Sequence, residues 1–299
     1  MIIDRALERH LKAQQGRSHS IWKAMNYGLF PGGKRIRPIL TLAAGEAFGG
    51  KQKQLLPFAS AVEMIHAYSL IHDDLPAIDN DDLRRGVPAA HKVFGEGMAL
   101  LAGDGLLTEA FHLMSSPQVV RSLPARRILE LIREISHASG VAGLVGGQAL
   151  DLEAESKEAD LATVEYIHVR KTGALILAAV RVGALVAGAK PAPLRRISRF
   201  GEILGLAFQI ADDVLDAEGH PAAGEGAESA RNERKKATYP SVVGLAQARE
   251  RLRELHQQCI KELAPLGGRA RPLREIAGYI VTRATHENVT HTLSRENNV

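Results

Sequence analysis

The chain has 299 residues and a mass of 32.3 kDa, with 45% hydrophobic and 24% charged residues. This composition excludes an intrinsically disordered protein and is typical of a globular chain with a sizeable core. The formal net charge of +4 comes from dispersed Lys and Arg without interleaved aromatic residues, which favours an anionic small molecule over nucleic acid as the ligand. The single cysteine, Cys259, excludes an intramolecular disulfide and predicts a reducing, cytoplasmic location, with its thiol buried as a small hydrophobe.

Helical spacing dominates the chain from its first residues. Residues 1–16 are charged throughout, which is not typical of a signal peptide. Apolar residues recur three and four apart in residues 100–114 and 128–135, whereas strand-like alternation is nearly absent. The most apolar stretch, residues 173–189, contains Arg181 and is predicted to be a buried core helix without membrane insertion. Pro and Gly separate segments long enough for ten or more helices, so we predict a single all-α domain over residues 1–299.

Cations cluster in GGKRIRP, residues 32–38. Two glycines followed by Lys34, Arg35 and Arg37 allow the backbone and side chains to close around a polyanion. The same letters also suit an ordinary basic turn on the surface. Lys171, and Lys235 with Lys236, are further cationic points, each of which would by itself indicate only a helix end or a solvated surface.

An acidic segment, DDLPAIDNDDLRRG, begins at Asp73 at the end of an apolar helical stretch. Five aspartates in ten residues repel one another unless cations lie between them. Ligands that are all oxygen favour a hard cation, and Mg²⁺ takes only one or two carboxylates while substrate phosphates complete its shell. Arg84 and Arg85 follow at once and suit forked contacts to phosphate oxygens. These two arginines favour a metal–phosphate site over a solvated acidic loop.

A second acidic segment is FQIADDVLD, residues 208–216. Asp212 and Asp216 are four residues apart, so both carboxylates lie on one face of a helix, about a turn apart. Apolar neighbours such as Ile203, Leu204 and Ile210 direct that face towards the interior, where a metal ion would offset the cost of burying charge. One such cluster is weak evidence, but two on apolar helices of one chain indicate a polyphosphate held through divalent ions. No nucleotide-binding glycine motif and no HExxH occurs.

With these segments in view, the chain resembles the trans-isoprenyl diphosphate synthases, and most closely the bacterial farnesyl diphosphate synthases. The resemblance extends from about residue 28 to about residue 283. It is carried by the stretches GGKRIRP, VEMIHAYSLIHDDLPAIDNDDLRRG, LAGDGLLTEAF, GGQALDLEAE, HVRKTGALI, GLAFQIADDVLD and KKATYP. It implies an antiparallel helix bundle around a deep cavity, usually a homodimer, which joins isopentenyl diphosphate head to tail to an allylic diphosphate with three Mg²⁺ ions as cofactors.

The resemblance also implies roles for individual residues. Mg²⁺ would be held by Asp73, Asp74, Asp79, Asp212, Asp213 and Asp216. Isopentenyl diphosphate would be held by Lys34, Arg37, His66 and Arg85. The allylic diphosphate would be held by Arg84, Lys171, Thr172, Gln209 and Lys236, with Thr172 and Gln209 facing the developing carbocation. The catalytic residues would be Asp73, Asp79, Arg84, Lys171, Thr172 and Gln209.

Product length follows from Tyr68, which lies five residues before Asp73 and so about one and a half turns deeper along the helix. A bulky side chain there would block a growing chain. Together with the inserted Pro76 and Ala77, it resembles the farnesyl type, and we predict a C15 product. A geranylgeranyl (C20) product is the alternative.

The chain departs from the family pattern between residues 219 and 231. Gly226 stands where a lysine is usual, and Arg231 stands near a usual aspartate. The stretch 217–231, rich in Ala, Gly and Glu, predicts a loop. A prenyl-diphosphate-binding paralogue with weak activity is therefore a second alternative. A class I terpene cyclase is disfavoured, because GGKRIRP and Arg84-Arg85 would serve a second diphosphate that such a cyclase does not bind.

Overall fold

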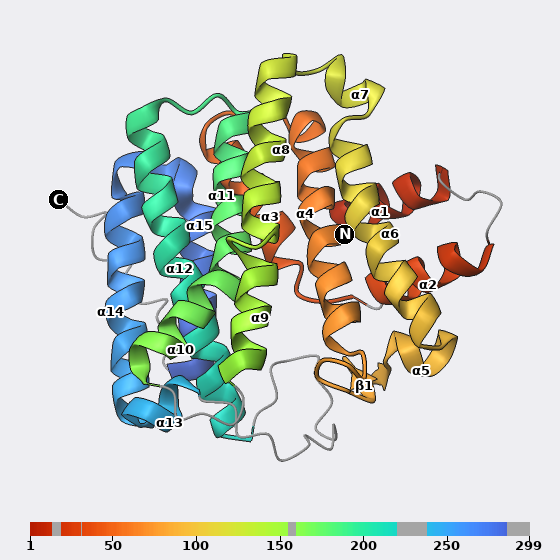
Figure 1. The fold of residues 1–299 in the computed structure, drawn as a ribbon. Helices are drawn as coiled ribbons and strands as arrows, with labels where there is room; N and C mark the ends of the chain where they lie inside the picture. Colours follow the sequence, from red (N-terminus) through yellow and green to blue (C-terminus); the bar gives the residue numbers. More distant parts are fainter. Residues whose placement is uncertain (14–18, 31, 155–159, 220–237, 286–299) are drawn as a thin grey trace.

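The computed structural model describes residues 1–13, 19–30, 32–154, 160–219 and 238–285. In these residues helices follow one another almost without interruption (Figure 1). The helices are α1 (Ile2–Ala13), α2 (His19–Leu29), α3 (Ile36–Ala47), α4 (Gln52–Asp73), α5 (Ala90–Phe94), α6 (Glu96–Met114), α7 (Pro117–Val120), α8 (Ala125–Ser139), α9 (Leu144–Ala154), α10 (Leu161–His168), η1 (Val169–Gly173, a π-helical turn), α11 (Ala174–Val186), α12 (Pro191–Ala217), α13 (Tyr239–Val243), α14 (Leu245–Leu263), η2 (Ala264–Ala270, a 3₁₀ helix) and α15 (Arg271–Thr285). The short strands β1 (Leu83–Arg84) and β2 (Val87–Pro88) pair antiparallel. The prediction of an all-α fold is confirmed.

The predicted helical spacing agrees with the burial of side chains. On α8, Ile128, Leu131 and Ile135 are buried, as their three- and four-residue spacing requires for one apolar face. On α11, Arg181 is accommodated in an apolar helix because its guanidinium has two partners. Its Nε donates a hydrogen bond to Glu134 at 2.6 Å, and its Nη1 donates one to Ser198 Oγ at 2.6 Å. In the described part of the chain, no helix is long and apolar enough to cross a membrane.

Helices α3, α4, α11 and α12 form the centre of the bundle. Helix α4 packs against α3, α6 and α11, and α12 packs against α11, α14 and α15. Close packing of α3 and α11 depends on Gly183, because a Cβ there would lie 2.1 Å from the carbonyl oxygen of Thr41. The buried apolar side chains of these helices form the core, in which Phe58 and Phe200 are among the largest.

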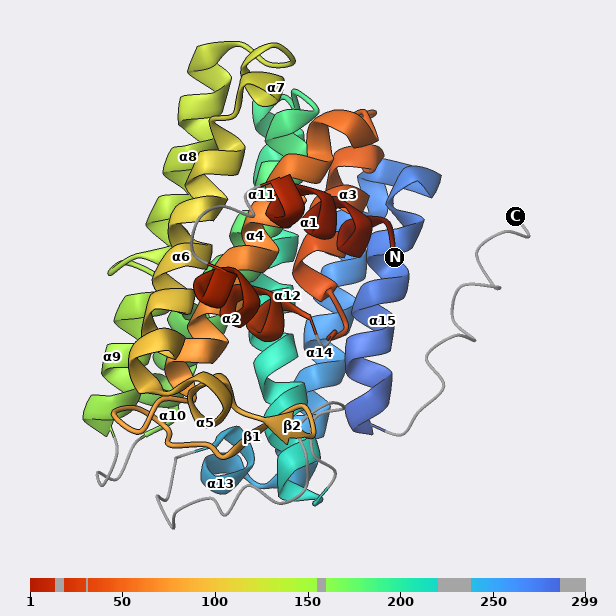
Figure 2. The ribbon, with the colours of Figure 1, turned by 90° about the vertical axis from the view of Figure 1, so that its right-hand side faces the viewer.

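One end of the bundle carries the acidic segments. Helix α4 ends at Asp73, beside the β1–β2 hairpin, and α12 ends at Ala217, on the side of α13; both ends lie at the bottom of Figures 1 and 2. Helices α1 and α2 lie across the outer side of the bundle in Figure 2. The apolar helices thus bring two charged helix ends, far apart in the sequence, to the same end of the molecule.

Candidate active site

A cavity of about 300 Å³ opens among α3, α4, α9, η1 and α12. Most residues that the sequence singled out line it. Its lining includes Lys34, Arg37, His66, Asp73, Arg84, Arg85, Lys171, Thr172, Gln209, Asp212 and Asp216. The side chains of Asp74, Asp79, Asp213 and Tyr68 do not belong to the lining. Lys236, Gly226 and Arg231 lie outside the described residues, so the predicted departure of residues 219–231 is not described beyond Gly219.

The two aspartates at the end of α4 have different surroundings. Asp73 lines the cavity, whereas Asp74 is 2% exposed. Arg84 donates to Asp74 Oδ1 through Nε at 2.8 Å and through Nη2, and it also lies 3.3 Å from Asp81. Burial raises the pKa of Asp74 to about 6, although Arg84 opposes that shift. Asp74 therefore positions Arg84 beside the cavity.

The turn after α4 brings Arg85 to the basic segment. The backbone N–H of Asp79 donates to the carbonyl of Asp73 at 2.8 Å and closes this turn. Arg85 has a φ of 55°, and its guanidinium donates to the carbonyl of Gly32. A Cβ on Gly33 would lie 2.6 Å from that guanidinium, so the glycine leaves the space that Arg85 occupies.

Two of the three cations of GGKRIRP, Arg35 and Arg37, have different roles. Arg35 is 3% exposed and donates to Glu63 at 2.5 Å and to the Leu29 carbonyl at 2.8 Å, so it holds the segment in place. Arg37 faces the cavity and lies 3.2 Å from Nε2 of His66. Burial, followed by the charge of Arg37, lowers the pKa of His66 well below its ordinary value. His66 is therefore neutral and accepts from Arg37.

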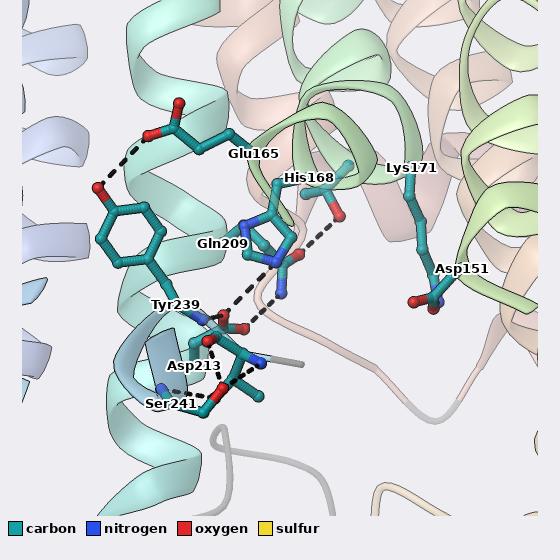
Figure 3. Close-up of polar contacts among 10 residues, drawn as sticks. Asp151, Glu165, His168, Lys171, Gln209, Asp213, Tyr239 and Ser241 are labelled. Carbon is teal, nitrogen blue, oxygen red and sulfur yellow. Dashed lines mark hydrogen bonds and ion pairs between the residues drawn. The ribbon is translucent and has the colours of Figure 1, made fainter. Parts of the chain in front are cut away.

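The second aspartate pair shows the same division. Asp212 and Asp216 line the cavity, and Arg283 of α15 donates to Asp212. Asp213 is 6% exposed and accepts from the backbone N–H of Tyr239 at 2.7 Å and from Gln209 Nε2 at 3.1 Å (Figure 3). Burial raises the pKa of Asp213 to about 6.

The π-helical turn η1 places Lys171 and Thr172 at the cavity. Lys171 donates to Asp151 at 2.6 Å (Figure 3). Thr172 Oγ1 donates to Gln209 Oε1 at 2.8 Å. Burial disfavours the charge of Lys171, but Asp151 and the nearby Asp73 outweigh it and raise its pKa. Helix α9 can approach η1 closely because Gly147 has no Cβ. A Cβ there would lie 2.2 Å from the backbone nitrogen of Lys171.

Two residues of the site received no role from the sequence. Asp151 holds Lys171, and Gln148 lines the cavity with neither of its side-chain polar atoms hydrogen-bonded among the described residues. Both belong to GGQALDLEAE, a stretch that contributed to the resemblance. Their spacing of three residues along a helix was the available signal, since it places both on one face.

The residues present fit Mg²⁺ held together with a phosphate ligand. Asp73 on one side and Asp212 and Asp216 on the other offer hard oxygen donors to one cavity. Within the described residues, no three acidic, His or Cys side chains converge closely enough to hold an ion by themselves. This arrangement suits Mg²⁺, which binds through one or two carboxylates and completes its shell with water and substrate phosphate.

Comparison with known proteins agrees with this geometry. The family model of polyprenyl synthetases matches residues 18–265. The farnesyl diphosphate synthase of Geobacillus stearothermophilus is 49% identical over 84% of this chain and 84% of its own length. That of Escherichia coli K12 is 46% identical over 94% of this chain and 95% of its own. Geranylgeranyl diphosphate synthases are also among the similar proteins.

A solved structure extends the similarity to the fold. The crystal structure of an FPP/GFPP synthase from Zymomonas mobilis superposes with a TM-score of 0.83 and is 38% identical. The match covers 93% of this chain and 96% of that protein.

Proposed function

This chain belongs to the polyprenyl synthetase family, and we propose that it joins isopentenyl diphosphate head to tail to dimethylallyl or geranyl diphosphate, with farnesyl diphosphate as its main product. It is a prenyltransferase that makes short-chain prenyl diphosphates. The observation that carries the proposal is that one cavity is lined both by two groups of cations and by the acidic ends of two helices. A chain that bound one diphosphate would not need both groups.

The two cationic groups suit the two substrates. Lys34, Arg37 and Arg85, with neutral His66, lie on the side of the basic segment and would hold isopentenyl diphosphate. Asp74 positions Arg84, and Asp151 positions Lys171. Thr172 and Gln209 form a hydrogen bond with each other beside them. This second set, with Lys236, would hold the allylic diphosphate.

The reaction breaks the allylic C–O bond, and the diphosphate leaves with the electron pair. The double bond of isopentenyl diphosphate then attacks the allylic cation, a C–C bond forms, and the departing diphosphate takes the proton that the adduct loses. Arg84 and Lys171 stabilise the leaving group where negative charge develops. Apolar residues of the lining, such as Leu70, Leu144 and Phe208, keep water from the cation.

We propose three Mg²⁺ ions, held by Asp73 and Asp79 on one side and by Asp212 with Asp216 on the other. When bound, they supply Lewis-acid stabilisation of the leaving diphosphate. The protein has to keep these carboxylates apart and oriented. Arg283 contributes by donating a hydrogen bond to Asp212.

We also propose a cytoplasmic homodimer. Leu100 and Leu101 on α6, and Val141 and Val145 around the start of α9, are between 44% and 85% exposed. Apolar side chains at such exposure are suited to the contact with a second copy. Cys259 is buried, as predicted, and suits a reducing compartment.

The decisive experiment incubates the purified protein with Mg²⁺, isopentenyl diphosphate and either dimethylallyl or geranyl diphosphate, and then sizes the products. We expect C15 as the main product, and none when EDTA removes the metal. A C20 main product would favour the geranylgeranyl alternative. Tight binding of the allylic diphosphate without turnover would favour the paralogue and contradict the proposal.

A further inference from the structure

Asp213 is buried where three elements meet. Its Oδ2 accepts from the backbone N–H of Tyr239 at 2.7 Å and lies 3.5 Å from Nε2 of His168 (Figure 3). Its Oδ1 accepts from Gln209 Nε2 at 3.1 Å. Helix α12 supplies the carboxylate, while α13 and the end of α10 supply two of its partners. Both oxygens therefore have N–H donors from the chain itself, and neither belongs to the cavity lining.

The carboxylate of Asp213 sets the direction of a chain of hydrogen bonds. An ionised carboxylate only accepts, so the amide of Gln209 must turn its NH₂ group towards Asp213. The carbonyl oxygen of Gln209 is then left to accept from the hydroxyl of Thr172 at 2.8 Å. Thr172 has thereby used its one proton, and the group that it offers to the cavity is an oxygen lone pair.

We propose that Asp213 is a positioning residue and not a magnesium ligand: it fixes the direction of the chain Asp213–Gln209–Thr172, so that Thr172 offers lone pairs to the developing allylic cation, and it anchors the start of α13 through Tyr239. The inference rests on the proposed function for its catalytic half. It assigns to Asp213 a role different from that of its neighbours Asp212 and Asp216, which line the cavity.

The geometry predicts what an amide does in this place. In Asp213→Asn, the backbone N–H of Tyr239 still points at one branch of the side chain, so the Asn oxygen stays on that side to accept from it. The Asn NH₂ group then faces Gln209, whose amide must turn over to accept from it. Gln209 now donates to Thr172, and the Thr172 hydroxyl turns its proton towards the cavity. A repulsive dipole replaces an attractive one at the cation.

The first experiment measures turnover, KM and Mg²⁺ half-saturation for Asp213→Asn. We expect kcat to fall by about a hundredfold, comparable to the loss of one preorganised polar group at a developing charge. KM for the allylic diphosphate and the Mg²⁺ half-saturation should stay within about threefold of wild type. Asp212→Asn is the matched control and should raise the Mg²⁺ half-saturation. An equal rise in both variants would overturn the inference.

A double-mutant cycle tests the route through Thr172. Thr172→Val removes the hydroxyl and should lower kcat by about tenfold. If Asp213 acts through that hydroxyl, adding Asp213→Asn to Thr172→Val should cost less than about threefold more, since the two effects are coupled. Additive losses would show that Asp213 acts by another route and would contradict the proposal.

A third measurement needs no turnover. Hydrogen–deuterium exchange should show the amide of Tyr239 protected in the wild type and at least tenfold less protected in Asp213→Asn, while Thr172→Val leaves it protected. Equal protection in all three proteins would overturn the anchoring of α13. This measurement does not depend on catalysis. If the wild type formed no prenyl diphosphate, the proposed function would fail, but exchange at Tyr239 would still test whether Asp213 anchors α13. Far-UV circular dichroism confirms that each variant is folded.

Discussion

The two aspartate pairs of this protein have the same letters and the same division of labour. At the end of α4, Asp73 lines the cavity and Asp74 is buried. Near the end of α12, Asp212 lines the cavity and Asp213 is buried. Consecutive helical residues point about 100° apart, so the two carboxylates of each pair meet different surroundings. Each pair therefore places one carboxylate in the cavity and one in the protein behind it.

The pairs differ in what the buried carboxylate holds. Asp74 accepts from the charged guanidinium of Arg84, which itself lines the cavity. Asp213 accepts only neutral N–H groups, from Tyr239 and Gln209. In the proposed reaction, the first pair would position a cation for the leaving anion, and the second would position neutral dipoles for the allylic cation. The same motif would then serve opposite charges on the two sides of one cavity.

The largest expected effect concerns the cavity-facing member of the first pair. Asp73→Asn removes a carboxylate that we expect to hold Mg²⁺, so turnover should fall by about 10³-fold and the Mg²⁺ half-saturation should rise. Steady-state kinetics over a Mg²⁺ titration measure both. Thermal unfolding without Mg²⁺ should change little, which separates this loss from misfolding. An unchanged Mg²⁺ half-saturation would remove Asp73 from the metal site.

A smaller effect is expected for the buried member of that pair. Asp74→Asn weakens the hold on Arg84, so KM for the allylic diphosphate should rise by about tenfold, in line with the loss of one charge-assisted hydrogen bond. The Mg²⁺ half-saturation should not change. Asp81→Asn is the matched control, because Asp81 lies 3.3 Å from Arg84 and is its lesser partner. If the control raises KM as much as Asp74→Asn does, Asp74 has no special role in positioning Arg84.

The two sides also differ one and a half turns before each pair. Five residues before Asp73 stands Tyr68, buried and bulky, whereas five residues before Asp212 stands Ala207. Burial, with the nearby Asp73 second, raises the pKa of Tyr68 to about 12, and its hydroxyl has no hydrogen-bond partner among the described residues. At this position only α4 carries a large side chain that could stop a growing product.

Tyr68→Ala should lengthen the product from C15 to C20 or beyond, with turnover within a fewfold of wild type, because the change opens space without touching a charged group. Chromatographic sizing of the products checks this. Tyr68→Phe is the control, since it keeps the bulk and loses only the hydroxyl, and it should still give C15. A C15 product from Tyr68→Ala would mean that another residue limits chain length.

Local patterns predicted much of this molecule. The helix of Ile128, Leu131 and Ile135 followed from spacing alone, because the burial of one helix face leaves a periodic trace in the sequence. The spacing of Asp212 and Asp216 likewise predicted that both carboxylates share a face, and both line the cavity. Such inferences need only the geometry of a single helix.

Contacts between helices could not be predicted from the sequence. Asp151 and Lys171 are 20 residues apart, and Arg283 and Asp212 are 71 apart, so their pairing depends on how whole helices pack. The burial of Asp74 and Asp213 likewise depends on the rotation of each helix about its axis, which the neighbouring helices set. The letters identify the carboxylates, but packing decides which of them meets the cavity.

The smallest expected effect comes from a carboxylate outside the cavity whose pKa moves in the opposite direction. Burial raises the pKa of Asp74 and Asp213 to about 6, because their partners do not outweigh it. At Glu109 on α6, burial also raises the pKa, but His10 Nε2 at 2.7 Å and His112 Nδ1 at 2.9 Å outweigh it and lower the pKa below its ordinary 4.5. The two imidazoles therefore lower the pKa of Glu109 despite its burial, whereas the neutral N–H groups of Tyr239 and Gln209 do not offset the burial of Asp213.

A carboxyl whose pKa is lowered on folding stabilises the protein above its unfolded pKa, and the stabilisation is lost as pH falls through the folded pKa. Glu109→Gln should therefore lower the free energy of unfolding by at most about 1 kcal/mol at pH 6, with a difference that shrinks as the pH falls below 4.5. Urea unfolding from pH 6 to pH 3.5 measures it, and the exposed Glu153→Gln controls for the loss of one carboxylate. A difference that grew towards acid would mean that His10 and His112 do not stabilise the ionised form, and that burial governs Glu109 as it governs Asp74 and Asp213.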